Sequence, residues 1–189
     1  MDKDIRQALL RYLEHTEPSA AIFHEFSLCR RAGRADCAVV NGALWGYEIK
    51  SERDTLARLT QQVENYETVF DYCCIVAASR HIQKIRATVP RRWGIFVALG
   101  SDLPTIEILR KPRRNNSTIK SSLIRLMWKP EIVRLLRGHN LDVTPSTSIG
   151  DLWDHALRLP HTAIADAVKS SLTARAVKLT AQQQILCGG

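Results

Sequence analysis

The stretch of residues 33–51 constrains the fold of this chain more than any other. It reads as two apolar, β-branched runs around Asn41-Gly42, and Asn-Gly between such runs is a strong signal for a β-hairpin. The same runs contain Asp36, Glu48 and Lys50. A charged group in a core is costly unless it is paired or bound to a metal. The hairpin therefore predicts a functional site as well as a local fold.

The register of this hairpin decides whether the charged residues can meet. Side chains alternate between the two faces of a strand, so Glu48 and Lys50 share one face and the apolar face opposite is expected to be the core. A regular two-residue turn would send Asp36 to the other face from Glu48. We therefore predict a bulge or an odd-length loop. A loop of residues 40–42 would place Asp36 diagonal to Glu48, and a loop of residues 41–43 would place it directly opposite.

Two carboxylates and a lysine on one sheet face suit a hard cation. Mg²⁺ prefers oxygen ligands and usually binds through one or two carboxylates plus substrate phosphate. Glu25, on the preceding strand or at its end, could supply a third carboxylate. The simpler alternative is a strand salt bridge between Glu48 and Lys50, which would explain those two residues alone.

The rest of the chain divides into two parts. Strands and helices alternate up to the basic, polar segment 110–118, which is typical of a linker, and only helices follow it. This order predicts an α/β fold with a mixed β-sheet flanked by helices, followed by a small helical C-terminal region. We expect domains at 1–111 and 112–189. The expected strands are 20–26, 34–40, 44–50, 72–78, 94–99 and 105–110, and the expected helices are 4–14, 54–70, 80–89, 119–127, 130–137, 149–159 and 163–179.

The helix expected after the hairpin has a core stripe of Leu59, Val63, Tyr66 and Phe70. Asp54 or Thr55 would cap its start. Gln62 lies one turn before Tyr66, so the two side chains are neighbours where the helix meets the sheet. Alternatively, the amide of Gln62 only satisfies a backbone group.

Together these positions resemble a known superfamily. The pattern Glu25 … Asp36 … Glu48-Ile49-Lys50 … Gln62-x-x-x-Tyr66 is similar to the PD-(D/E)XK nucleases, which have the restriction-endonuclease-like fold, and in particular to their RecB-type Q-x-x-x-Y branch. The run from residue 46 to residue 71 also resembles poorly characterised nuclease-like proteins of bacteria and phages. Ala35 stands where the superfamily name places proline.

The resemblance implies a deoxyribonuclease that depends on Mg²⁺ or Mn²⁺. Asp36, Glu48 and the backbone carbonyl of Ile49 would be metal ligands, and Lys50 would orient the attacking water. Glu25 would be an auxiliary ligand or orienting group, and Gln62 and Tyr66 would support the site.

The charge of the chain agrees with a nucleic-acid partner. Lys and Arg number 27 against 19 Asp and Glu, which gives a net charge of +8. The candidate phosphate contacts are Arg30, Arg31, Arg34 and Arg58. The simpler interpretation of the first three is a solvated basic loop, and the simpler interpretation of Arg58 is an ion pair with Asp54. DNA is the expected partner, RNA is an alternative, and a homodimer is one option for the oligomeric state.

Other features exclude other classes of protein. No apolar run approaches the ~20 residues of a membrane span, and the start is an amphipathic helix rather than a signal peptide, so we expect a cytoplasmic protein. The five cysteines contain no C-x-x-C pair, which argues against a zinc site or a disulfide framework. Cys37, Cys73 and Cys74 are expected in the core. Trp128 and Trp153 are expected to anchor helix packing, and the alternative is that they are platforms for base stacking. Two rivals to a nuclease remain, a catalytically silent nucleic-acid-binding module on the same fold and a protein-interaction adaptor.

Overall fold

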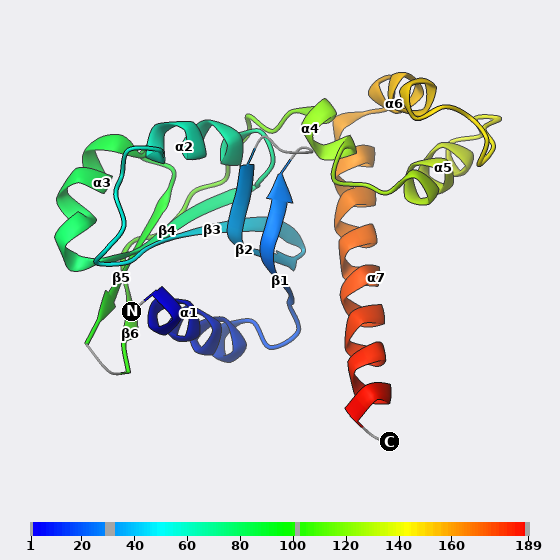
Figure 1. Ribbon diagram of the computed structural model, residues 1–189. Coiled ribbons are helices and arrows are strands. Elements are labelled where there is room, and N and C mark those ends of the chain that lie inside the picture. Colours follow the sequence, from blue (N-terminus) through cyan, green and yellow to red (C-terminus); the bar gives the residue numbers. More distant parts are fainter. Residues whose placement is uncertain (1, 29–32, 101–102, 188–189) are drawn as a thin grey trace.

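The computed structural model describes residues 2–28, 33–100 and 103–187. Within these residues one mixed six-stranded sheet is flanked by helices, and a helical region follows it (Figure 1). The elements are α1 (Asp2–Thr16), β1 (Ala21–Leu28), β2 (Gly33–Asn41), β3 (Ala43–Lys50), α2 (Leu59–Glu67), β4 (Tyr72–Ala78), the 3₁₀ turn η2 (Ser79–His81), α3 (Ile82–Thr88), β5 (Gly94–Leu99), β6 (Thr105–Arg110), α4 (Lys120–Ile124), α5 (Lys129–Gly138), α6 (Ile149–Leu157) and α7 (His161–Cys187).

The strands lie in the sheet in the order in which they follow along the chain, from β1 to β6. β3, β4 and β5 are parallel, whereas β1–β2, β2–β3 and β5–β6 are antiparallel pairs. β4, β5 and β6 begin and end at the predicted residues. The prediction of a mixed sheet with flanking helices and a helical C-terminal region is therefore confirmed.

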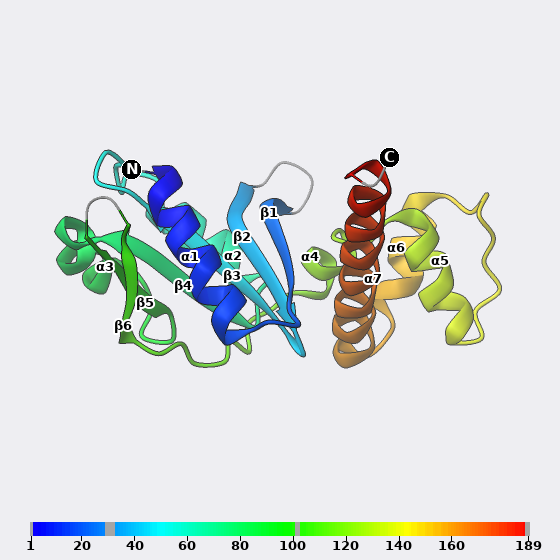
Figure 2. The ribbon, with the colours of Figure 1, turned by 90° about the horizontal axis from the view of Figure 1, so that it is seen from below.

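Both faces of the sheet are covered. α1 crosses one face, where Leu9 and Leu13 pack against Tyr47 and Ile49 of β3 (Figure 2). α2 and α3 cover the other face, which is the one that carries Glu48 and Lys50. The expectation of one core face and one charged face was therefore incomplete, because the charged face is itself largely buried beneath α2.

The start of α2 differs from the prediction. The helix begins at Leu59, and neither Asp54 nor Thr55 caps it. The Asp54 carboxylate instead accepts hydrogen bonds from the backbone N–H and the hydroxyl of Ser51, at 2.7 and 2.6 Å. This local bond closes a turn directly after β3 and delays the helix, since short acidic side chains compete for nearby backbone donors.

The segment between the sheet and the helical region is bound to α2. Asn115 is 3% exposed. Its side-chain amide donates hydrogen bonds to the carbonyls of Glu67 and Phe70, at 2.8 and 2.9 Å, and its backbone N–H donates to Asp71 at 2.7 Å. These bonds satisfy the carbonyl of the last residue of α2, which the helix itself leaves unpaired, and two carbonyls of the turn that follows.

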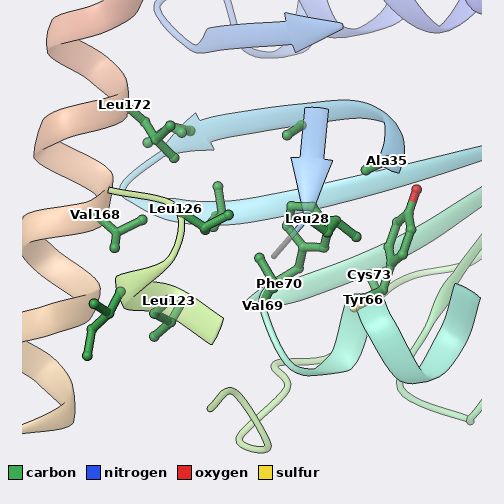
Figure 3. Close-up of a cluster of buried hydrophobic side chains, with 14 of the residues drawn as sticks. Leu28, Ala35, Tyr66, Val69, Phe70, Cys73, Leu123, Leu126, Val168 and Leu172 are labelled. Carbon is green, nitrogen blue, oxygen red and sulfur yellow. The ribbon is translucent and has the colours of Figure 1, made fainter. Parts of the chain in front are cut away.

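The helical region packs against the β1 edge of the sheet. α7 runs beside β1 and contacts both β1 and β2 (Figures 1 and 2). One hydrophobic cluster extends from the underside of α2 to α7, through the residues shown in Figure 3. The labelled members of that cluster are Leu28, Ala35, Tyr66, Val69, Phe70, Cys73, Leu123, Leu126, Val168 and Leu172.

Three further expectations can be compared with the structure. Cys37, Cys73 and Cys74 are buried free thiols, as predicted, whereas Cys29 and the side chain of Cys187 lie outside the described residues. Trp153 is partly buried against the main cluster, as predicted for a packing anchor. Trp128 does not fit that prediction, because it is 62% exposed and its ring lies beside the Arg175 guanidinium.

Candidate active site

The β2–β3 hairpin has the register that brings the charged residues together. Val40 pairs with Leu44 and Cys37 with Tyr47, and Gly42 adopts a φ of +64° at the turn. This register places Asp36 directly opposite Glu48. The prediction that the turn is not a regular two-residue turn is therefore confirmed, and of the two loops predicted the structure has the one formed by residues 41–43. A glycine is suited to this position because it adopts a positive φ without steric cost.

The Glu48 carboxylate is the centre of a buried hydrogen-bond network. Glu48 is 2% exposed and Lys50 is 6% exposed. Lys50 Nζ lies 2.8 Å from Glu48 Oε1 and 2.9 Å from the side-chain oxygen of Gln62. Gln62 Nε2 donates to the same Glu48 oxygen, and the Tyr66 hydroxyl donates to the other at 2.7 Å. Gln62 and Tyr66 therefore lie side by side over the sheet, as the spacing in the sequence predicted.

The approach of α2 to the sheet depends on Gly46. A Cβ atom at this position would lie 2.3 Å from the ring of Phe70. Real side chains do not tolerate that distance, so only glycine lets the turn after α2 come this close to β3. This close contact keeps Tyr66, which is one turn before Phe70, within reach of Glu48.

Asp36 has a different environment from Glu48. Its Oδ2 accepts the backbone N–H of Ile49 at 2.8 Å, beyond the last hydrogen-bonded pair of the hairpin. Burial, followed by repulsion from the Glu48 carboxylate, raises the pKa of Asp36 from 3.8 to about 6, despite the opposing effects of the Ile49 N–H, Arg6 and Lys50. The two facing carboxylates thus repel one another.

Arg6, on α1, is a site residue that the sequence did not reveal. Its guanidinium donates to the backbone carbonyl of Asp36 at 2.9 Å and approaches the Asp36 carboxylate at 3.4 Å. The same guanidinium pairs with Glu25 at 2.8 Å. No short motif marks Arg6, because it lies on the polar side of an ordinary amphipathic helix far from the hairpin in sequence.

Glu25 lies next to the other carboxylates without joining them. The pairs His24–Cys37 and Phe26–Ala35 set a register in which Glu25 is opposite Asp36. One Glu25 oxygen contacts Arg6, and the other contacts Arg34 at 2.5 Å. Arg6 thus stands between Glu25 and Asp36, and the role of Glu25 as an auxiliary ligand stays a prediction.

A cleft of about 500 Å³ lies between the β2–β3 hairpin and α2. Asp36, Glu48 and Lys50 line it, together with the exposed side chains of Arg34 and Arg58 at its rim. Arg58 forms no ion pair with any described carboxylate, because Asp54 is held by Ser51 instead. Arg30 and Arg31, the other candidate phosphate contacts, lie outside the described residues.

The cleft offers two carboxylates to a divalent cation. No group of three or more His, Cys, Asp or Glu side chains in the described part of the chain could hold a metal ion. The facing pair Asp36 and Glu48 remains, with oxygen donors and a mutual repulsion that Arg6 and Lys50 offset only in part and that a cation would relieve. Two carboxylates are the number that Mg²⁺ commonly uses when substrate and water complete its shell. The site therefore fits the expected metal, while a role for the Ile49 carbonyl stays a prediction.

None of the described helices is both long enough and apolar enough to cross a membrane.

Comparison with known proteins places the whole chain in one family. The sequence model of the family described as bacteriophage P4 protein cII matches residues 1–180. Protein cII of Enterobacteria phage P4 is 27% identical over 144 residues, which cover 74% of this chain and 54% of that protein. The chain thus spans about half the length of this curated relative. No solved structure matches the chain. Because the family match extends over almost its full length, the chain belongs to the bacteriophage P4 cII family.

Proposed function

We propose that this protein is a Mg²⁺- or Mn²⁺-dependent nuclease that hydrolyses phosphodiester bonds of DNA. The observation that carries the proposal is the pair of carboxylates, Asp36 and Glu48, facing each other across the hairpin at the floor of a cleft, with Lys50 beside them. The raised pKa of Asp36 supports it, because a pair of mutually repelling carboxylates attracts a cation. We propose hydrolysis of phosphodiester bonds as the reaction because the sequence resembles the PD-(D/E)XK nucleases.

Each residue of the cleft has a distinct role in this proposal. A divalent cation held by Asp36 and Glu48 would lower the pKa of a water molecule and stabilise charge on the phosphate. Gln62 and Tyr66 fix the Glu48 carboxylate by hydrogen bonds to its two oxygens. Lys50 uses two of its three N–H donors on Glu48 and Gln62, which leaves one for the attacking water.

The rim of the cleft supplies the contacts to the polyanion. Arg34 and Arg58 are exposed and line the cleft, so their guanidinium groups can bind phosphates on either side of the scissile bond. DNA as substrate agrees with the cytoplasmic location expected from the sequence, and RNA is the alternative nucleic acid. Both arginines would contribute a salt-dependent term to affinity.

The decisive experiment compares Lys50→Ala with the wild type on a panel of DNA and RNA structures, in Mg²⁺, Mn²⁺ or EDTA. We expect cleavage that needs metal and is abolished in Lys50→Ala, while DNA binding is largely retained. One lysine adds little to a net charge of +8, but a cation positioned at the attacking water acts in the transition state. Lys84→Ala, which removes an exposed lysine of α3, is the matched control and should cleave normally.

Absence of cleavage in both Mg²⁺ and Mn²⁺ would refute the nuclease, and two further results would count against the role given to Lys50. Because Lys50→Ala leaves Glu48 buried without its ion pair, Lys50→Arg tests the same position with the charge kept, and full activity in that variant would remove the positioning role. Equal loss of binding and cleavage in Lys50→Ala would make Lys50 a phosphate anchor.

A catalytically silent nucleic-acid-binding module is the second candidate. It is favoured by the engagement of both Glu48 oxygens within the protein and by the pairing of Glu25 with two arginines. Salt-dependent DNA binding without cleavage in either metal would select this candidate.

A further inference from the structure

A second cavity lies on the outer side of the β1–β2 pair. This groove, of about 710 Å³, is bounded by β1, by the connection from α4 to α5 and by α7. Phe23 and Phe26 of β1 face Leu172 and Leu179 of α7 across it, and Trp128 stands at its edge. The groove is separate from the cleft that holds Asp36, and the nuclease proposal makes no use of it.

Trp128 is exposed and yet held in place. It is 62% exposed, and the Arg175 guanidinium lies 4.2 Å from its ring centroid. Arg175 is anchored by Glu131, through a 2.8 Å bond from Nε, and by the carbonyl of Leu126 at 2.9 Å. Glu131 also accepts the backbone N–H of Trp128 at 2.6 Å, at the start of α5. A buried ion pair therefore fixes an aromatic ring whose larger part faces solvent.

The walls of the groove carry uncompensated positive charge. Arg125, Lys129 and Lys178 line it, and none of the three forms an ion pair with a carboxylate in the part of the chain that the structure describes. Arg125 lies over the ring of Trp153, 5.5 Å from its centroid. The acidic residue of the wall, Glu25, is already neutralised by Arg6 and Arg34. The groove thus combines basic side chains with an accessible aromatic face.

We propose that this groove binds single-stranded DNA, with Trp128 as a platform on which one base stacks and with Arg125, Lys129 and Lys178 as phosphate contacts. Basic grooves with aromatic platforms are how proteins hold single strands without reading their sequence, and stacking on a side chain requires a base that is free of the duplex stack. The inference rests on the proposed nuclease function in one respect, since it names the substrate class of that same protein.

One ion pair has a partner in each cavity, so the groove and the cleft lie close together. Glu25 belongs to the wall of the groove, and its partner Arg34 lines the cleft. Ser27, also in the groove, pairs in the β1–β2 ladder with the same Arg34. A single strand seated on Trp128 therefore needs to cross only the β1–β2 pair to reach Asp36.

The test measures fluorescence anisotropy of a labelled oligothymidylate of about 20 nucleotides, a length that exceeds a typical single-strand site. The full protein is used in EDTA, so that binding is observed without cleavage, and a duplex of the same length is measured in parallel. Trp128→Leu should weaken single-strand binding by roughly 5- to 100-fold, the loss typical of one stacked base. Trp128→Phe should recover part of that loss.

Charge variants separate stacking from general attraction. Lys129→Gln and Lys178→Gln should each lower the slope of log affinity against log salt by about 0.7, the value for one phosphate contact on a single strand. Lys84→Gln, on α3 and outside the groove, should leave single-strand affinity almost unchanged. Circular dichroism of each variant checks that the fold is retained.

The outcomes distinguish this inference from the proposed function. Unchanged single-strand affinity in a folded Trp128→Leu protein would overturn the groove assignment, even if the protein cleaves DNA. Cleavage of duplex DNA without measurable single-strand binding would also overturn it, and would leave the β1 edge for a protein segment. Single-strand binding that depends on Trp128, with no cleavage in either metal, would support the groove and refute the nuclease.

Discussion

Replacing Asp36 with asparagine should stabilise the metal-free protein at neutral pH, although it removes a residue central to the proposed site. The variant keeps the size of the side chain and the oxygen that accepts the Ile49 N–H. It removes the negative charge that burial and Glu48 disfavour. Charged groups gathered for function commonly cost stability in the absence of their ligand.

The magnitude follows from the pKa of Asp36. Folding raises it from 3.8 to about 6, so the folded state binds a proton more tightly than the unfolded state does. The free energy of unfolding of the wild type therefore falls as pH rises from about 4 to about 6, and above that range the full destabilisation by the ionised Asp36 is present. Two pKa units correspond to about 3 kcal/mol. Because the new amide must also fit beside Arg6, a gain of about 1–3 kcal/mol is expected at pH 7.

Urea unfolding in EDTA across this pH range, for wild type and Asp36→Asn, measures the difference directly. The gain in free energy of unfolding should shrink as the pH falls towards 3.8 and disappear below about pH 3, where Asp36 is protonated in both states. Calorimetric titration with Mn²⁺ should show sharply weaker binding by the variant. A pH-independent difference, or a variant less stable than wild type at pH 7, would refute the electrostatic reasoning, and unchanged Mn²⁺ affinity would remove Asp36 as a ligand.

Two further variants test the support of the site. Gly46→Ala should lower the free energy of unfolding, measured with denaturant, by about 1–3 kcal/mol or more, because its methyl group would overlap the Phe70 ring. Gly42→Ala is the matched control: its methyl group would meet no atom within 4 Å, so it shows the cost of backbone strain alone. Mn²⁺ binding should be lost at a higher pH in Arg6→Gln than in the wild type, since Arg6 favours the ionised form of Asp36. If calorimetry at several pH values shows no such difference, Arg6 has only a structural role.

The hairpin was predictable because its constraints are local. The alternation of side chains along two adjacent strands, together with the requirement that Asp36 and Glu48 share a face, was enough to exclude a regular two-residue turn. It left two loops open, and the structure has the one with residues 41–43 at its tip. Gln62 and Tyr66 were predictable for the same reason, since one helical turn determines their spacing. The part of the site between residues 36 and 66 therefore follows largely from short-range periodicity.

The features that were missed depend on contacts distant in sequence or on competing local bonds. Arg6 reaches Asp36 from α1, and no periodicity links two residues that far apart. The start of α2 was missed because Asp54 bonds to Ser51 rather than capping the helix. Trp128 was predicted to anchor helix packing, whereas its exposure and its Glu131–Arg175 support are visible only once α5 and α7 are packed together.

The bonds made by Asn115 have a consequence for how the two parts of the chain depend on each other. Asn115 joins the residues after the sheet to the carbonyls of Glu67 and Phe70, at the end of the helix that carries Gln62 and Tyr66. A protein shortened to end at residue 111 would lose these bonds and uncover the cluster that Leu123 and Leu126 complete. The helices after the sheet thus hold in place the helix whose Gln62 and Tyr66 bind the Glu48 carboxylate, so a change in the C-terminal region can reach the cleft without touching it.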